Sequence, residues 1–307
     1  MHFRRLDLNL LVALDALLAE RNITQAGKRL YLTQSAMSGS LARLREFFDD
    51  PLLVPAGRKM VLTPLAERLA GPVHDLLVRA RATIELQPTF DPTTSRRHFR
   101  LMMSDYVGAV MMADAVRLAA ERAPGVTFDI VHNNIEAPEE TLERAEIDLL
   151  IMPVDYLSPG HPHEVLFEDE YVCIAWRGND AVGETLSVEQ YLAAGHVGAR
   201  FGGIRSTAID DWFVQHSGVA RRMEVFGMNL TSIPQLVVGT RRIATMHRRL
   251  AELFATQLPI RLLPPPFTVP PLAEALQWHS AFDQDPGLLW LRALLREVAG
   301  SATPDRG

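Results

Sequence analysis

Apolar positions near the start of the chain recur at helical spacing in successive segments. In the first segment the leucines on one face are Leu6, Leu10, Leu11, Leu14, Leu17 and Leu18. This spacing predicts an amphipathic helix. Asn22 is a good N-cap for a second, short helix whose apolar face holds Ile23, Ala26 and Leu30. Thr33 is the expected N-cap of a third helix, after a turn of three to four residues.

The third helix is expected to present two different faces. Its core face holds Met37, Leu41, Leu44 and Phe48, and its outer face holds Ser35, Ser38, Gly39 and Ala42. Two helices joined by a short turn are typical of a helix-turn-helix unit. The second helix of that unit lies in the DNA major groove, and small outer side chains would let its axis approach the bases.

Specific residues of this helix fit DNA recognition. The Gln34 amide could bond adenine, and the hydroxyls of Ser35 and Ser38 can donate or accept. Free N–H groups behind Thr33 suit a phosphate. Two further candidates, Arg43 and Arg45, would contact the DNA backbone. A plain helical hairpin is the alternative, although Gly39 in mid-helix costs about 1 kcal/mol relative to alanine.

Residues 49–63, "DDPLLVPAGRKMVLT", consist of two short apolar runs around a turn sequence. They predict a β-hairpin with Gly57 in the turn and the basic residues Arg58 and Lys59 at the tip. A basic hairpin beside the helix pair would form a wing that reaches the minor groove or flanking phosphates.

A long helix is expected over residues 63–87, capped by Thr63 and with Pro64 at its first position. Its apolar stripe is close to heptad spacing and consists of Leu65, Leu69, Val73, Leu76, Ala80 and Ile84. The stripe either pairs with a second copy or packs against its own chain. We favour dimerisation because symmetric half-sites on DNA require it. Gly71–Pro72 is expected to interrupt and bend the helix.

After a polar hinge at 86–97, apolar runs typical of strands alternate with helical patterns. The strands are expected at 99–104, 126–131, 148–152, 165–176, 196–201, 222–226, 242–246, 260–263 and 272–278. This alternation predicts βαβ units. Ligands of open α/β sheets bind beyond the carboxyl ends of the strands.

Residues at those strand ends are the candidates for binding a small molecule. They are Ser104, Asp105, Pro153, Arg200, Phe201, Gly203, Arg205, Asn229, Thr231 and Met246. Their hydroxyls, amides, aromatic ring and arginines suit a small, flat, partly anionic molecule such as an aromatic acid or phenol. Each residue alone has a simpler explanation in loop or cap chemistry; Ser104, for example, precedes a helix and can cap it.

The charge of the chain is uneven. The net charge is −6, but residues 1–90 hold 12 basic and 9 acidic side chains, and residues 21–60 hold 7 basic and 3 acidic ones. A basic segment on an acidic protein is a localised anion site, and nucleic acid is one candidate. A merely solvated basic face is the alternative.

Composition narrows the class further. Hydrophobic residues make up 48% and aromatic residues 7%, which favours helix-rich or α/β architecture. The single cysteine, Cys173, excludes a disulfide framework and fits a reducing compartment. No apolar run approaches the ~20 residues of a membrane span. We therefore expect a cytoplasmic protein without a membrane partner.

Enzyme and cofactor signals are weak. His161 and His163 lack further ligands at matching spacing and are read as a solvated loop. "GARFGG" lacks the order of a dinucleotide fingerprint, and G-x-S-x-G is absent. Cys173 lies in an apolar run, and Glu139–Glu140 and Asp210–Asp211 fit exposed helix charges. We expect no enzyme activity, no cofactor and no metal.

The order of these segments resembles that of the LysR-type transcriptional regulators. It runs from a helix through "TQAGKRLYLTQSAMSGSLARLRE", a basic wing and "LTPLAERL" to a long helix and about 215 further residues. "FRLMMSDYV", "RRIATMHRRL" and "DPGLLWLR" are most similar to the nodulation and aromatic-degradation regulators. Ser35 stands where the family usually has proline, and Gly27 where alanine is common; both bear on base contacts rather than on the fold.

The resemblance implies an N-terminal all-α winged helix-turn-helix with a long linker helix, followed by a C-terminal α/β effector domain. That domain would consist of two periplasmic-binding-protein-like subdomains joined by a hinge. The implied boundaries are 1–62 for the DNA-binding domain, 63–90 for the linker helix and 91–307 for the effector domain. Subdomain I would hold 91–164 and 268–307, and subdomain II would hold 165–267.

The resemblance implies a transcriptional regulator that binds double-stranded promoter DNA. We expect it to be an activator. Dimers would pair through the linker helix and assemble into a homotetramer. A small aromatic effector that binds between the subdomains would change the angle between them. That change would alter the spacing of the DNA-binding heads, and with it DNA bending and contact with RNA polymerase. The alternative is a cytoplasmic α/β solute-binding or enzyme module with a helical protein-interaction head. A steep salt dependence of DNA binding would distinguish the first from the second.

Overall fold

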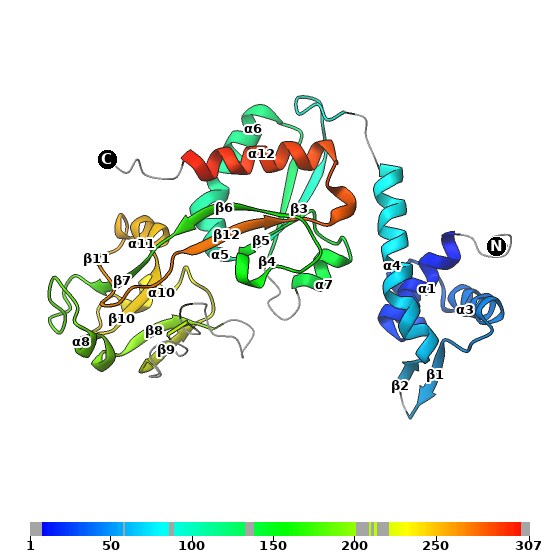
Figure 1. Ribbon diagram of the computed structural model, residues 1–307, viewed down its shortest axis with the longest axis horizontal. Helices are drawn as coiled ribbons and strands as arrows, with labels where there is room; N and C mark the ends of the chain where they lie inside the picture. The colour runs from blue at the N-terminus through cyan, green and yellow to red at the C-terminus, as the bar shows by residue number, and fades with distance from the viewer. Residues whose placement is uncertain are drawn as a thin grey trace. The chain divides into compact units, whose positions relative to one another are not determined.

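The structure is a computed structural model that describes residues 8–57, 59–85, 89–132, 138–200, 209, 212, 213 and 221–301. The chain forms two compact units, Met1–Leu86 and Gln87–Gly307. Figure 1 shows a helical first unit and a second unit built on two sheets. No helix within the described ranges combines the length and apolar character needed to cross a membrane.

Three short helices form the core of the first unit: α1 (Leu8–Glu20), α2 (Ile23–Arg29) and α3 (Gln34–Phe48). The side chain of Asn22 accepts the N–H groups of Thr24 and Gln25, at 2.9 and 3.1 Å. Thr33 Oγ1 accepts the N–H of Ala36 at 3.2 Å. These bonds confirm both predicted N-caps. The side chains fully buried between the helices include Leu14, Leu17, Met37, Leu41 and Leu44.

The turn between α2 and α3 is a Schellman motif with an unusual residue in it. Leu32 N–H bonds to Gly27 O at 2.8 Å, and Tyr31 N–H bonds to Lys28 O at 3.2 Å. The motif places Tyr31 at φ 56°, a conformation that favours glycine or asparagine. A side-chain carbon on Gly27 would lie 3.0 Å from Leu32 O, so glycine relieves the crowding where the turn folds back.

The predicted hairpin and long helix are both present. Strands β1 (Leu53–Ala56) and β2 (Lys59–Leu62) pair antiparallel, with Gly57 at φ 65° in the turn. Helix α4 spans Pro64–Glu85. Thr63 caps it by accepting the N–H of Ala66 at 3.2 Å, and donates its own hydroxyl to Asp50 at 2.7 Å.

Helix α4 differs from expectation in two respects. It continues through Gly71–Pro72 without interruption. Its apolar stripe also divides between two environments. Leu69 and Val73 pack into the core of their own unit, whereas Leu76 and Ile84 are 50% and 78% exposed. The first half of the stripe therefore stabilises the unit itself, and only the second half is left available to a second copy.

The first sheet of the second unit has the strand order β4-β3-β5-β12-β6. Its strands are β3 (His98–Met103), β4 (Thr127–His132), β5 (Leu149–Pro153), β6 (His163–Asp169) and β12 (Leu272–Gln277). β3 runs parallel to β4 and β5, while β12 is antiparallel to β5 and β6. Helices α6 (Ala113–Arg122) and α12 (Pro286–Ser301) lie side by side (Figure 1) and are joined by the Arg122–Glu297 ion pair at 2.7 Å.

The second sheet has the order β11-β7-β10-β8-β9. Its strands are β7 (Tyr171–Trp176), β8 (His196–Ala199), β9 (Met223–Gly227), β10 (Ile243–His247) and β11 (Ile260–Leu263). β8, β9 and β10 are parallel, and β7 is antiparallel to both of its neighbours. The helices that pack on it include α10 (Ile233–Val237) and α11 (Arg248–Ala255), and α8 (Val188–Ala193) precedes β8.

The remaining short elements link these strands. They are α5 (Asp105–Val107), the π-helical η2 (Gly108–Met112), α7 (Pro138–Glu143), η3 (Val154–Tyr156) and η4 (Ser280–Phe282). Each predicted strand run contains a strand, but 165–176 holds two strands of different sheets, β6 and β7. The chain thus changes sheet at Glu170 and returns between β11 and β12. We refer to the parts around the first and second sheets as subdomains I and II.

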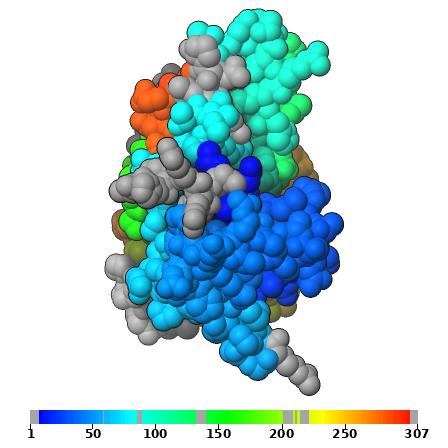
Figure 2. Space-filling model, turned by 90° about the vertical axis from the view of Figure 1, so that its right-hand side faces the viewer, coloured from blue at the N-terminus to red at the C-terminus, as the bar shows by residue number. Residues whose placement is uncertain are grey.

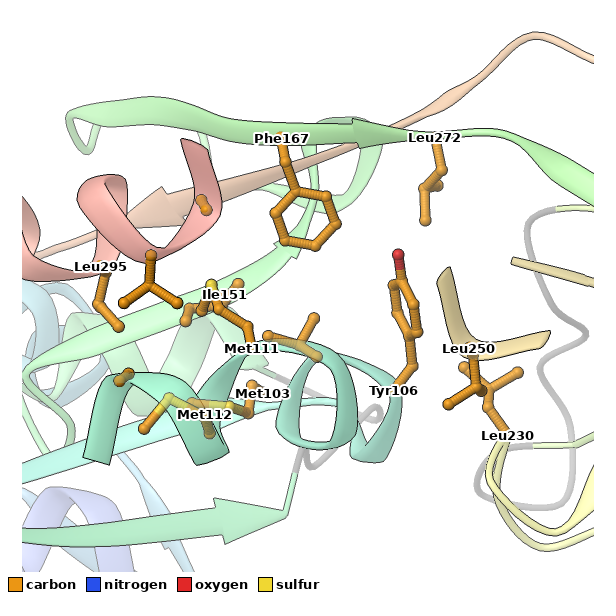
Figure 3. Packing of buried hydrophobic residues seen from close by; sticks show 14 of the residues in the cluster. Met103, Tyr106, Met111, Met112, Ile151, Phe167, Leu230, Leu250, Leu272 and Leu295 are labelled. Atoms are coloured by element: carbon orange, nitrogen blue, oxygen red, sulfur yellow. The ribbon is translucent and has the colours of Figure 1, made fainter. Parts of the chain in front are cut away.

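One buried hydrophobic cluster runs through both subdomains. It joins Phe99 and Ile151 of the first sheet to Ile174 and Val197 of the second. Figure 3 shows Tyr106 at the junction: its ring reaches from α5 toward Leu272, beside Leu230 and Leu250 of subdomain II. The two subdomains therefore share a core as well as two chain crossings.

Candidate functional site

The outer face of α3 is exposed within the described part of its own unit. Gln34, Ser35, Ser38 and Ala42 are all exposed. A side-chain carbon at Gly39 would meet no described atom within 4 Å beyond its own stretch of helix. The core face holds Met37, Leu41 and Leu44, as the pattern predicts. This face is therefore narrow and open, the shape that a helix needs to enter a major groove.

The two arginines of α3 are placed differently. Arg43 lies exposed beside the open face. Arg45 points to the wing: its Nε donates to Pro51 O at 2.8 Å and its Nη2 to Leu53 O at 2.9 Å. Arg45 thus fixes the start of β1 against the end of α3. The sequence alone predicts only a contact of Arg45 with the DNA backbone.

The wing hairpin projects from the rounded surface of the helices (Figure 2). Lys59 is exposed at the start of β2. The other predicted tip residue, Arg58, lies outside the described residues. Thr33, exposed at the start of α3, uses its hydroxyl oxygen to cap that helix. The open face of α3, Arg43 and Lys59 make up the candidate DNA-binding surface.

At the carboxyl end of β3, Ser104 and Asp105 have different partners. Ser104 Oγ accepts the N–H of Val107 at 3.3 Å, so it caps α5. Asp105 reaches into subdomain II, where its two carboxylate oxygens accept the N–H groups of Leu230 at 3.2 Å and Thr231 at 2.6 Å. The structure thus joins two of the predicted effector residues, Asp105 and Thr231, directly to each other.

The loop that holds Thr231 is tightly folded. Asn229 Oδ1 accepts the N–H of Ser232 at 3.1 Å, and Ser232 Oγ donates to Asn229 O at 2.9 Å. A side-chain carbon at Gly227 would lie 2.7 Å from Ser232 Oγ, so only glycine fits this approach. Asn229 therefore serves the shape of the loop.

Other predicted effector residues are spread over the structure. Arg200 is exposed, with its guanidinium carbon 3.8 Å from the ring centre of Phe226. Pro153 is half-buried at the end of β5, opposite Glu274. Met246 is 2% exposed and packs in the shared core. Phe201, Gly203 and Arg205 lie outside the described residues.

A buried polar group at the junction of the subdomains was missed by sequence analysis. Tyr106 donates its hydroxyl to Asp169 Oδ2 at 2.5 Å, and Asp169 also accepts the N–H of Arg249 at 3.2 Å. The His247 ring stacks on Tyr106 at 4.2 Å between centroids and lies 5.0 Å from Tyr171. Burial raises the pKa of Tyr106 and of Asp169.

Burial also shifts the pKa values of Glu274 and His247 at this junction. Burial, together with the nearby charge of Asp169, raises the pKa of Glu274 to about 8. Burial lowers the pKa of His247 to about 4, against the opposing effect of Asp105. Glu274 Oε2 and His247 Nδ1 have no hydrogen-bond partner among the described residues. The one sign of Glu274 in the sequence is that it is the single charged residue in the apolar run "LAEALQ".

Cysteine and metal chemistry have little basis in the described structure. Cys173 is fully buried in β7, and burial raises the pKa of its thiol to about 11. Such a thiol is a packing residue rather than a nucleophile. Across the described ranges, no three side chains of His, Cys, Asp or Glu converge to hold a metal ion.

A separate surface hollow of about 540 Å³ lies at the amino ends of β8, β9 and β10. Its floor includes Ala194 and Gly195, and Glu224 at its rim pairs with Arg222 at 3.2 Å and Arg242 at 2.8 Å. It lies at the opposite end of these strands from Arg200 and Asn229. The charged side chains at its rim already form ion pairs within the protein.

Comparison with known proteins gives full-length matches. A model of the LysR substrate binding domain matches residues 93–300, and a model of the lysR-family bacterial regulatory helix-turn-helix protein matches residues 8–67. Nodulation protein D 2 of Rhizobium tropici is 44% identical over 299 residues, covering 97% of this chain and 95% of that protein. Nodulation protein D 1 of Bradyrhizobium diazoefficiens is 41% identical over 301 residues, covering 98% and 96%. The crystal structure of a probable transcriptional regulator from Pseudomonas aeruginosa has a TM-score of 0.66 and 30% identity, covering 96% and 98%.

Proposed function

Because the chain belongs to the LysR family of transcriptional regulators, it is a DNA-binding regulator with an effector-binding domain and not an enzyme, and we propose the residues and effector through which it acts. In this proposal the protein is an activator, and a small aromatic effector changes how it binds promoter DNA. The observation that carries the DNA-binding part is the exposed face of α3, where a side-chain carbon at Gly39 would meet no described atom within 4 Å beyond its own stretch of helix.

In the proposed complex α3 enters the major groove and the wing lies beside it. Gln34, Ser35 and Ser38 read base edges, because their amide and hydroxyl groups match the donors and acceptors there. Arg43, Arg58 and Lys59 neutralise phosphates. Arg45 contributes indirectly, because it already bonds to Pro51 and Leu53 and so positions the wing.

Fluorescence anisotropy on a duplex selected by the native protein from a random pool tests this assignment. Arg43→Ala should weaken binding to all sequences and reduce the salt slope by about 1. Ser38→Ala should weaken binding mainly to the selected sequence. Arg117→Ala, an exposed change in α6, serves as the control. Native-like binding by both α3 variants would show that another surface holds the DNA.

The proposed assembly is a homodimer through α4, and two dimers form a homotetramer. Support comes from Leu76 and Ile84, which are apolar, exposed and separated by two turns of the helix. Sedimentation of Ile84→Glu should show smaller species than native, whereas Asp75→Asn, an exposed polar change in α4, should sediment as native. An unchanged Ile84→Glu assembly would place the interface elsewhere.

The proposed effector is a small, flat, aromatic acid or phenol that binds between subdomains I and II. It acts by binding one arrangement of the subdomains better than the other. The resulting change in angle alters the spacing of the DNA-binding heads, DNA bending and contact with RNA polymerase. Thermal-shift screening of aromatic acids, phenols and flavonoid-like compounds tests this, because a ligand of the folded form raises the melting point. A complete set without a shift would contradict the effector class.

A further inference from the structure

The contact between Asp105 and the 227–232 loop has the form of a bound anion in a receptor. Each oxygen of the carboxylate accepts a different backbone N–H, from Leu230 at 3.2 Å and from Thr231 at 2.6 Å. The carboxylate comes from subdomain I and both donors come from subdomain II. A single side chain therefore links the two halves of the effector domain through two charge-assisted bonds.

The receptor half of this contact is organised without help from Asp105. The Asn229–Ser232 bonds and the space left by Gly227 hold the loop in one conformation. That conformation directs two consecutive N–H groups toward the same acceptor, an arrangement that binds anions. Removing the carboxylate would leave the N–H pair in place and in need of another anion.

We propose that Asp105 is an internal ligand whose carboxylate occupies the N–H pair of Leu230 and Thr231, and that the anionic group of the effector displaces it. The proposal rests on the effector function above and names its chemistry: a carboxylate or phenolate. Exchange of one anion for another keeps both N–H groups paired and returns the Asp105 charge to water. A neutral ligand lacks this route, because it would accept the two bonds more weakly.

Displacement of Asp105 would release one of the links between the subdomains and keep another. Tyr106, the next residue, remains stacked on His247 of subdomain II at 4.2 Å and bonded to Asp169 at 2.5 Å. The shared core around Leu230 and Leu250 also persists. The expected motion is therefore a rotation about the Tyr106–His247 contact.

Spin labels on the two subdomains can measure this without effector or DNA. Glu121→Cys in α6 and Glu184→Cys in the loop before α8 place labels at exposed positions. Cys173 is buried and its thiol pKa is raised to about 11, so it should stay unlabelled in the native fold. Double electron–electron resonance then gives the distribution of distances between the labels.

Asp105→Ala should broaden and shift that distribution, and a high concentration of sodium acetate should move the native protein toward the same distribution by displacing the carboxylate. Acetamide, the neutral isostere, should leave the native distribution unchanged. Asp105→Asn keeps the shape of the side chain but offers one oxygen to two donors, so it should broaden the distribution without a loss of folding. Asp114→Asn, an exposed change in α6, should match native.

A native distribution in both Asp105 variants would overturn the proposal, as would equal effects of acetate and acetamide on the native protein. Either failure would leave the thermal-shift screen valid as a test of the effector function. Conversely, a complete thermal-shift screen that finds no ligand would not affect a link between Asp105 and the loop that the spin labels had measured. The two proposals can therefore fail separately.

Discussion

The imidazole of His247 stacks on the phenol ring of Tyr106, with 4.2 Å between the ring centroids, and the two residues come from different subdomains. Both rings are almost completely buried. A charged imidazole would be costly in this position, because the surroundings replace water. The contact between the subdomains therefore depends on His247 staying neutral.

Acid is expected to weaken the fold through His247. Its pKa is about 4 in the folded protein, below the ordinary 6.5, so the folded state binds fewer protons between these values. Its contribution is complete above pH 6.5 and is lost as the pH falls through about 4. His247→Phe keeps an aromatic ring and should remove up to about 3 kcal/mol of that loss. Urea unfolding at pH 7 and pH 4.5 measures it; equal losses in native and variant would contradict it.

A rise in pH is expected to destabilise the fold through Glu274. Its pKa is about 8 when folded and 4.5 ordinarily, so the folded state holds a proton that the unfolded state releases. The contribution is complete below pH 4.5 and is lost as the pH rises through about 8. Glu274→Gln should match native near pH 4.5 and exceed it by about 5 kcal/mol above pH 8. A constant difference across this range would show that the carboxyl does not titrate there.

Gly39 should separate stability from DNA binding. Gly39→Ala is expected to raise the free energy of unfolding by about 1 kcal/mol, because alanine is the better helix former and nothing lies nearby. Gly39→Glu should leave the fold intact and abolish DNA binding, since it adds bulk and negative charge to the open face. Urea unfolding and anisotropy measure the two effects. Retained DNA binding by Gly39→Glu would exclude this face from the groove.

Tyr31 is expected to destabilise the protein through its backbone conformation. It is 98% exposed and adopts φ 56° in the turn before α3. Asparagine tolerates that conformation better, so Tyr31→Asn should stabilise the protein by about 0.5–1 kcal/mol. Tyr31→Phe keeps the strain and should unfold at the native urea concentration. If Tyr31→Asn is the less stable protein, the exposed ring must have a partner in solution.

Local chemistry made much of the fold predictable. The N-caps Asn22, Thr33 and Thr63 follow from side chains that accept the first free N–H groups of a helix. The hairpin follows from Gly57 between two apolar runs, and the faces of α3 follow from helical periodicity. Each of these depends on residues that are close in sequence.

Features that depend on distant partners could not be predicted. The run 165–176 is apolar on both sides of the acidic residues Glu168, Asp169 and Glu170. Pairing with β12, or with β10 and β11, is what assigns β6 and β7 to different sheets. The stripe of α4 gives no sign that Val73 is covered by its own unit while Ile84 is not. Asp105 and Thr231 were both candidates for an effector, but their mutual bond joins residues more than a hundred positions apart.

The position of β12 in the first sheet also has a consequence for synthesis. β5 and β6 both pair with β12, which comes near the end of the chain and after all of subdomain II. While the ribosome is still making subdomain II, β5 and β6 have no strand between them. Their exposed edges should then recruit chaperones, and the nascent protein should resist protease at this sheet only after residues 272–277 have left the exit tunnel.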